Sequence, residues 1–322
     1  MGNKTLTIVL CQTREGNYTF SSLASKVLTS LESDLAFCGS ASHNPDDLIL
    51  KNSKYCWNFS EPADWSEAAD SISSDSGNWR ELVKLCKNFL GGSGLHQSIG
   101  SGLIIMYWRE ILRRELNEEI LQSYDWFVIT RSDFLWQIEH PNVDLLNPER
   151  IYLLDGEKYG GISDRHIVFH RKHADKVLSF AAPIFHDALN IKERLVEKSF
   201  SDINPEKYLA FIAEEYGISQ YFTFLPYLGF AIRHPETSTR WASGFFDKSR
   251  NYYIKYPSEM KATIRSQLIL KSQEDWFKFL NKKRYLRFLI YKIRGFIFKN
   301  RLPVRIYFRI AFIKLKRRIE TA

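Results

Sequence analysis

The sequence predicts an α/β protein built on a largely parallel β-sheet with helices on both faces. Apolar, often β-branched runs alternate with segments of helical periodicity, which is the pattern of repeated βαβ units. With 322 residues, 44% of them hydrophobic, the chain can bury a full core. Polar residues directly follow several of the apolar runs. Because the carboxyl ends of parallel strands meet at one edge of a sheet, we expect a functional site at that edge.

The first elements form a βαβ opening. The β-branched run at 5–11 predicts a buried strand, the spacing over 20–31 predicts a helix, and 34–38 predicts a second strand. Residues 41–76 are rich in Ser, Asp and Asn and predict an irregular segment, although its aromatic residues indicate that it is packed. A helix is expected over 79–89.

The centre of the chain continues the alternation. A glycine-rich turn at 91–102 leads into a predicted helix at 103–116, but it matches neither the Walker loop nor the dinucleotide fingerprint. Helix entry and close packing are its favoured roles, with contact to a ligand as the alternative. The remaining predicted elements are strands at 125–129, 151–154 and 166–169, helices at 172–180 and 205–216, and an apolar stretch at 221–232.

The charge of the chain predicts a division near residue 245, into a catalytic region 1–245 and a helical basic tail 246–322. Residues 281–322 hold 14 Lys and Arg and one acid, a net charge of +13, so the other 280 residues carry −5. Basic residues interleaved with Phe, Tyr, Ile and Leu over 282–318 predict an amphipathic segment on an anionic membrane surface. A helical hairpin packed on the catalytic region is the alternative.

Cysteine usage and hydropathy predict the compartment. The four cysteines have no CxxC spacing and indicate neither a zinc site nor a disulfide framework, which suits a reducing compartment. No uninterrupted apolar run reaches the length of about 18 residues that a membrane span needs. We therefore expect a cytoplasmic protein, peripheral on the inner face of a membrane.

An acid stands directly after the buried run at 125–129, in the segment Thr130-Arg131-Ser132-Asp133. Transfer of a sugar from a nucleoside diphosphate requires stabilisation of the leaving diphosphate, commonly by a divalent cation held through carboxylate oxygen. Asp133 is thus a candidate metal ligand. A turn or capping aspartate is the alternative.

Two motifs carry a resemblance to a known family. The segments VITRSDF at 128–134 and YGGISDRHIVF at 159–169 resemble bacterial glycosyltransferases of surface polysaccharide assembly, such as capsule and lipopolysaccharide. The resemblance implies a GT-A fold, a nucleotide-sugar donor and an Mn²⁺ or Mg²⁺ cofactor that Asp133 would bind. In that family the turn is usually Asp-x-Asp. Here Arg131 replaces the first acid, so Arg131 is expected to contact a phosphate or the ribose instead.

The second motif supplies the other catalytic candidates. Gly160 and Gly161 leave room for a sugar to approach the backbone, and an acid and a base follow them. Asp164 is expected to deprotonate or bind the acceptor hydroxyl, with Arg165 orienting it or binding phosphate. A local ion pair between Asp164 and Arg165 in a β-turn is the alternative.

Two further groups of residues are expected to bind the donor. Thr13 and Arg14 follow the first strand, where enzymes of this architecture receive the base and ribose; an exposed surface role is the alternative for Arg14. After the last apolar stretch, Arg233 and Arg240 are expected to neutralise the diphosphate, and His234 to ligate the metal. For His234 a solvated loop position is the alternative.

Together these observations predict a glycosyltransferase that acts on a glycan or lipid-linked acceptor. A non-enzymatic nucleic-acid-binding protein that uses the basic aromatic tail is the second hypothesis. The acidic balance of the other 280 residues makes nucleic acid an unlikely partner. Another nucleotide-dependent transferase or phosphotransferase is the third hypothesis, and the missing Walker and kinase motifs count against it.

Overall fold

A computed structural model describes residues 3–41, 46–75, 77–85, 102–200, 203–234 and 244–281. The chain forms two compact units, Met1–Gln273 and Glu274–Ala322. Helix α13 (Gln273–Asn281) supplies what is described of the second unit. The predicted basic tail at 282–318, Arg240 and most of the glycine-rich turn lie outside the described residues. Within the described ranges, no helix is both long and apolar enough to cross a membrane.

A mostly parallel sheet forms the centre of the first unit, in the strand order β3-β2-β1-β4-β7-β6-β8. Only the two pairs that involve β7 are antiparallel. The predicted α/β class is therefore confirmed. The strands are β1 (Thr5–Gln12), β2 (Ser33–Ser40), β3 (Tyr55–Asn58), β4 (Trp126–Thr130), β6 (Ile151–Leu154), β7 (His166–His170) and β8 (Phe222–Leu225).

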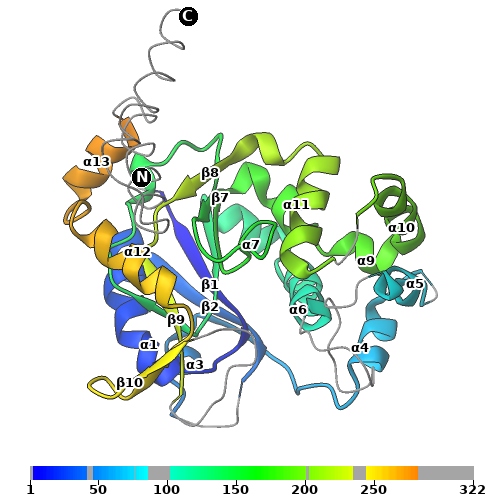
Figure 1. The fold of residues 1–322 in the computed structure, drawn as a ribbon, viewed down its shortest axis with the longest axis horizontal. Helices are drawn as coiled ribbons and strands as arrows, with labels where there is room; N and C mark the ends of the chain where they lie inside the picture. The colour runs from blue at the N-terminus through cyan, green and yellow to red at the C-terminus, as the bar shows by residue number, and fades with distance from the viewer. Residues whose placement is uncertain are drawn as a thin grey trace, which may run out of the picture. The chain divides into compact units, whose positions relative to one another are not determined.

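Helices cover both faces of this sheet. Figure 1 shows α1 on one side of β1 and β2, and α6 and α11 on the other. Alternate residues of β1, Leu6, Ile8 and Leu10, join one buried cluster with Met106 and Leu112 of α6. The helices are α1 (Gly16–Leu23), η1 (Ala24–Leu28), α2 (Thr29–Leu31), α3 (Leu48–Asn52), α4 (Trp65–Ile72), α5 (Trp79–Lys84), α6 (Gly102–Glu115), α7 (Glu118–Ser123), η2 (Val143–Leu145), η3 (Arg171–His173), α8 (Ala174–Leu178), α9 (Ala182–His186), α10 (Ala188–Glu197), α11 (Pro205–Glu215), η4 (Ser219–Tyr221) and α12 (Pro257–Gln267).

A small antiparallel sheet, in the order β10-β11-β9-β5, was not predicted. Its strands are β5 (Phe134–Trp136), β9 (Gly229–Arg233), β10 (Phe245–Asp247) and β11 (Tyr252–Ile254). Strands of three residues are too short for a periodic pattern to reveal them.

The division of the chain also differs from the prediction. The first compact unit continues beyond residue 245, to Gln273. Strand β11 pairs with β9, and the Thr263 hydroxyl of α12 donates a hydrogen bond to the Gly229 carbonyl at 2.8 Å. These contacts attach residues 246–273 to the first unit.

The segment at 41–76 is packed, as predicted, but its described part is more regular than expected. It contains α3, α4 and the edge strand β3, which pairs in parallel with β2. The Asp47 carboxylate accepts hydrogen bonds from the first turn of α3, and Asp64 does the same for α4. The Asp residues that suggested irregular chain therefore act as helix N-caps.

The strand order creates a topological switch point at β1. The chain leaves β1 toward β2 on one side, whereas β4 lies on the other side. Ligands of open α/β sheets bind at the carboxyl ends of strands at such a point. Because β7 is antiparallel to β4, with His166 opposite Thr130, its amino end lies at the same edge. Residues 164–165 are thereby brought beside residues 131–133.

Candidate active site at the carboxyl edge of the sheet

Hydrogen bonds join the loops that follow β1 and β4. The Ser132 hydroxyl donates to the Gln12 carbonyl at 2.6 Å, and the Thr19 hydroxyl donates to the Ser132 carbonyl. At the end of β1, Cys11 adopts a left-handed φ of 84°. Its carbonyl oxygen lies so close to Gly39 that a Cβ there would be 1.7 Å away. This packing fixes the direction in which the chain leaves β1.

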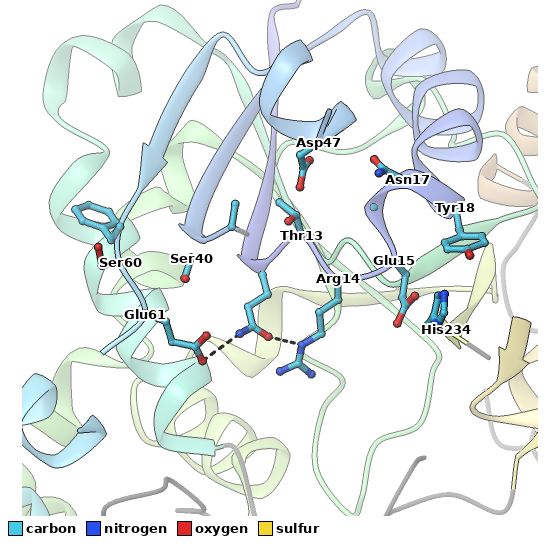
Figure 2. A pocket seen from close by; sticks show the side chains of 14 residues that line it. Thr13, Arg14, Glu15, Asn17, Tyr18, Ser40, Asp47, Ser60, Glu61 and His234 are labelled. Carbon is cyan, nitrogen blue, oxygen red and sulfur yellow. Dashed lines mark hydrogen bonds between the residues drawn. The ribbon is translucent and has the colours of Figure 1, made fainter. Parts of the chain in front are cut away.

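A cavity of about 670 Å³ opens at the ends of β1 and β2 (Figure 2). Its volume suits a ligand the size of a nucleoside. The His234 ring lies edge-on to Tyr18 at its border, with ring centroids 5.7 Å apart. The structure thus brings the predicted residues Thr13, Arg14 and His234 to one cavity. The described residues that line it are Gln12, Thr13, Arg14, Glu15, Gly16, Asn17, Tyr18, Ser40, Ala41, Asp47, Phe59, Ser60, Glu61 and His234.

Arg14 connects this cavity to a smaller neighbouring pocket. Its Nε donates to the Gln12 side chain, whose amide in turn donates to Glu61 at 3.2 Å. The smaller pocket, of about 60 Å³, is lined by Arg14, Arg131 and Asp133 among others. Arg14 lines both spaces.

Asp133 is buried between two arginines. Arg131 donates to it through two bonds, from Nε at 3.0 Å and from Nη2 at 2.9 Å, and Arg233 at the end of β9 donates to the same carboxylate. Burial raises the pKa of Asp133, but the charges of Arg131 and Arg233 outweigh this and hold it well below its ordinary value. The carboxylate is therefore ionised and fully engaged by guanidinium groups.

Lys255, directly after β11, adds a cation that the sequence analysis missed. Burial and the charges of Arg131 and Arg233 lower its pKa to about 7. Burial and the same two arginines lower the pKa of Arg14. These shifts show that four cations lie within electrostatic reach of one another. The sequence placed Lys255 in the tail, and nothing in its local pattern signals the β9–β11 pairing that brings it here.

The described residues do not fit a divalent cation at Asp133. Both of its oxygens accept hydrogen bonds from guanidinium groups, and the surrounding cations would repel a metal ion. His234 lines the large cavity, whereas Asp133 lines the small pocket. Across the described ranges, no group of three or more His, Cys, Asp or Glu residues could hold a metal. This geometry does not support the predicted metal-ligand roles of Asp133 and His234.

The glycine pair of the second motif packs against the start of α11. A Cβ on Gly161 would lie 1.9 Å from the Glu206 carbonyl oxygen, and Gly160 has a left-handed φ of 86°. The Ile162 amide donates to that carbonyl at 3.1 Å. Close packing thus explains why residue 161 is a glycine. The role of Gly160 and Gly161 in donor binding stays a prediction.

Asp164 is buried just before β7. Its main-chain carbonyl accepts a hydrogen bond from the Arg109 side chain of α6 at 3.1 Å. Its carboxylate makes no hydrogen bond or ion pair with another described residue, although its charge acts on Arg131 and Glu206. A carboxylate without a fixed partner at the ligand edge is available for chemistry.

Arg165 does not form the local pair with Asp164 that the sequence suggested as an alternative. It forms a buried ion pair with Glu259 of α12, and its guanidinium lies over the Tyr256 ring at 4.4 Å. Glu259 also accepts a hydrogen bond from the Glu157 amide at 2.8 Å. Arg165 therefore ties α12 to the sheet edge beside Asp164.

Glu206, in the first turn of α11, is a second carboxyl that the sequence analysis missed. Burial and the charge of Asp164 raise its pKa to about 7. A carboxyl whose pKa lies near neutrality is typical of acid–base sites. The sequence offered no signal, because Glu206 follows Pro205 at an ordinary helix start.

Comparisons with known proteins identify no family. No protein-family model matches the chain, and no curated protein matches its sequence. Among solved structures, the apo form of mouse xyloside xylosyltransferase 1 is similar over 69% of this chain and 84% of that chain, at 12% sequence identity and a TM-score of 0.37. A likeness at that score assigns no function to this chain.

Proposed function

We propose that this chain is a glycosyltransferase that moves a sugar from a nucleoside diphosphate to a hydroxyl of an acceptor. One observation carries the proposal: a nucleoside-sized cavity, a group of cations and the Asp164 carboxylate, which has no partner among the described residues, converge at the switch point between β1 and β4. This is where open α/β sheets bind ligands. The resemblance of VITRSDF and YGGISDRHIVF to polysaccharide glycosyltransferases supports the same assignment.

The donor would bind with its base and ribose in the large cavity, beside Thr13 and Arg14. Its diphosphate would then lie toward Arg131 and Arg233. Negative charge develops on the leaving diphosphate as the bond to the sugar breaks, and fixed cations at that position lower the barrier.

The acceptor hydroxyl would lie near Asp164 and Glu206. Its oxygen forms the new bond to the anomeric carbon while the bond from that carbon to the diphosphate oxygen breaks. The hydroxyl proton passes to one of the two carboxylates, and Glu206, with its pKa of about 7, is matched to that task near neutral pH.

The proposal extends to the acceptor class and the location, for which the sequence supplies the support. A glycan or lipid-linked acceptor in surface polysaccharide assembly suits the family resemblance, and the basic segment 282–318 suits attachment to the anionic inner face of a membrane. A cytoplasmic, peripheral enzyme would meet both its donor and such an acceptor there.

A donor screen tests the proposal. UDP-, GDP-, CMP- and dTDP-sugars are added to the protein with EDTA or with Mn²⁺ or Mg²⁺, and thermal unfolding is recorded. The matching donor should raise Tm by about 5 °C at saturation, because it binds the folded state alone. Arg131→Ala should remove the shift. Arg250→Ala, which removes an exposed arginine, should keep it. If no donor changed Tm or was hydrolysed, the glycosyltransferase assignment would be wrong.

A further inference from the structure

Four cations gather at the carboxylate of Asp133. Arg131 and Arg233 donate hydrogen bonds to it, Arg14 lines the same small pocket, and Lys255 follows β11, in which Tyr253 is paired with Arg233. With Asp133 ionised, they leave a net charge of +3 when Lys255 is protonated. Glu61 also lines the small pocket and lowers this formal excess to +2. The charge of Arg165 is balanced by its ion pair with Glu259, and the charge of Arg109 offsets that of Asp164.

These cations retain unused hydrogen-bond donors. The Nε of Arg14 is bonded to Gln12, but its terminal nitrogens have no carboxylate partner among the described residues. Lys255 Nζ lies 5.0 Å from the centre of the Tyr256 ring, and no described carboxylate pairs with it. Donors that are crowded by like charges and have no carboxylate partner in the described part of the chain form a site for an external anion.

The positions of the four residues suit an extended anion. Arg14 follows β1, Arg131 follows β4, Arg233 ends β9 and Lys255 follows β11. The cations therefore come from the ends of four strands in two different sheets. Asp133 holds Arg131 and Arg233 in fixed orientations, which reduces the entropy lost when the anion binds.

Resting on the proposed function, we propose that Arg14, Arg131, Arg233 and Lys255 bind the donor diphosphate directly, in place of a divalent metal ion. The diphosphate of a nucleotide sugar carries a negative charge on each phosphate, and the leaving nucleoside diphosphate gains one more when the sugar departs. Fixed cations stabilise that additional charge, which is the task that a metal ion performs in Asp-x-Asp enzymes. Asp133 then serves as a positioning residue for two arginines.

The test uses the full-length protein with inorganic pyrophosphate as a base-independent probe and calorimetry as the readout. Pyrophosphate should bind in EDTA. Lys255→Met should weaken binding about tenfold or more, because a charge-assisted hydrogen bond is lost. Lys248→Met, which removes an exposed lysine in the β10–β11 turn, should bind as the wild type does. Thermal unfolding of each variant establishes that it is folded.

A second arm measures nucleoside diphosphates and sugar transfer in EDTA and in Mn²⁺. Binding and transfer in EDTA that Mn²⁺ changes by less than about threefold would support direct binding by the cations. Absence of pyrophosphate binding in EDTA, or transfer that occurs only with Mn²⁺, would overturn the inference while leaving the glycosyltransferase assignment intact. Pyrophosphate binding without any nucleotide-sugar reaction would instead support the anion site and reject the proposed function.

Discussion

At the residue scale, Glu206 makes a prediction about pH. Its pKa of about 7 means that the carboxyl is protonated in weakly acidic solution. A proton acceptor must be ionised, so kcat for sugar transfer at saturating donor should rise with pH up to about 7 and then level off. In kcat/KM the same rise should be followed by a fall, because free Lys255, with a pKa of about 7, loses the charge that binds the donor. Glu206→Gln should lower kcat by about 100-fold or more and abolish this rise, with the donor KM nearly unchanged. A pH–rate profile of both proteins measures the effect.

The stability of the same variant separates catalysis from folding. Because the folded-state pKa of Glu206 lies above its unfolded value, its stabilising contribution is complete below the unfolded pKa and is lost as pH rises to about 7. Gln cannot ionise, so at pH 8 Glu206→Gln should unfold at the same or a higher temperature than the wild type. A variant that melts lower and keeps the wild-type pH profile would exclude the catalytic role.

The sequence identified site residues that stand next to a long apolar strand and missed those that do not. Asp133 and Asp164 stand beside apolar runs, and the structure places both at the carboxyl edge of the sheet. Glu206 and Lys255 come from a helix start and a short hairpin. Their part in the site arises from tertiary packing, which no local pattern encodes.

At the element scale, the contact between the 155–165 loop and α11 makes the second prediction. A Cβ on Gly161 would overlap the Glu206 carbonyl, so Gly161→Ala must displace the start of α11 and with it the Glu206 carboxyl. We expect a loss of about 1–3 kcal/mol in the free energy of unfolding, together with a loss of activity. Denaturant unfolding and a transfer assay measure the two.

Gly156→Ala is the matched control in the same loop. Its Cβ would meet Glu259 and Ser163 side-chain oxygens at 3.4 Å, which is ordinary contact, so this variant should stay close to the wild type. If both substitutions lowered stability and activity equally, the effect of Gly161→Ala could not be assigned to its contact with α11.

Long, buried strands were predicted from the sequence more accurately than short or edge strands. The strands β1, β4 and β6 are buried over most or all of their length and were located within one or two residues. The edge strand β3 alternates between half-buried and exposed residues and was missed, as were the three-residue strands of the small sheet. Edge and short strands bury too little surface to leave a hydrophobic signature.

At the scale of the whole molecule, the distribution of charge makes the last prediction. The full-length protein should sediment with vesicles that contain anionic phospholipid and should not sediment with neutral ones. Replacing Lys314, Lys316, Arg317 and Arg318 by Gln should reduce binding strongly, since each basic residue contributes about 1 kcal/mol near such a surface. Transfer to a soluble acceptor should be unaffected. Equal sedimentation of the substituted and wild-type proteins would refute the role of the tail.

The small antiparallel sheet has a consequence for how relatives of this chain could diverge. Half of the cationic site, Arg233 and Lys255, is delivered by β9 and β11. A descendant that lost residues 233–255 would lose both cations in a single deletion, and would keep the site only by acquiring another source of positive charge. An aspartate at position 131 would provide one, because the loop after β4 would then carry an Asp-x-Asp motif that could bind a metal ion. Relatives with Arg131 should therefore keep Arg233 and Lys255, whereas relatives with an aspartate at that position should tolerate their loss.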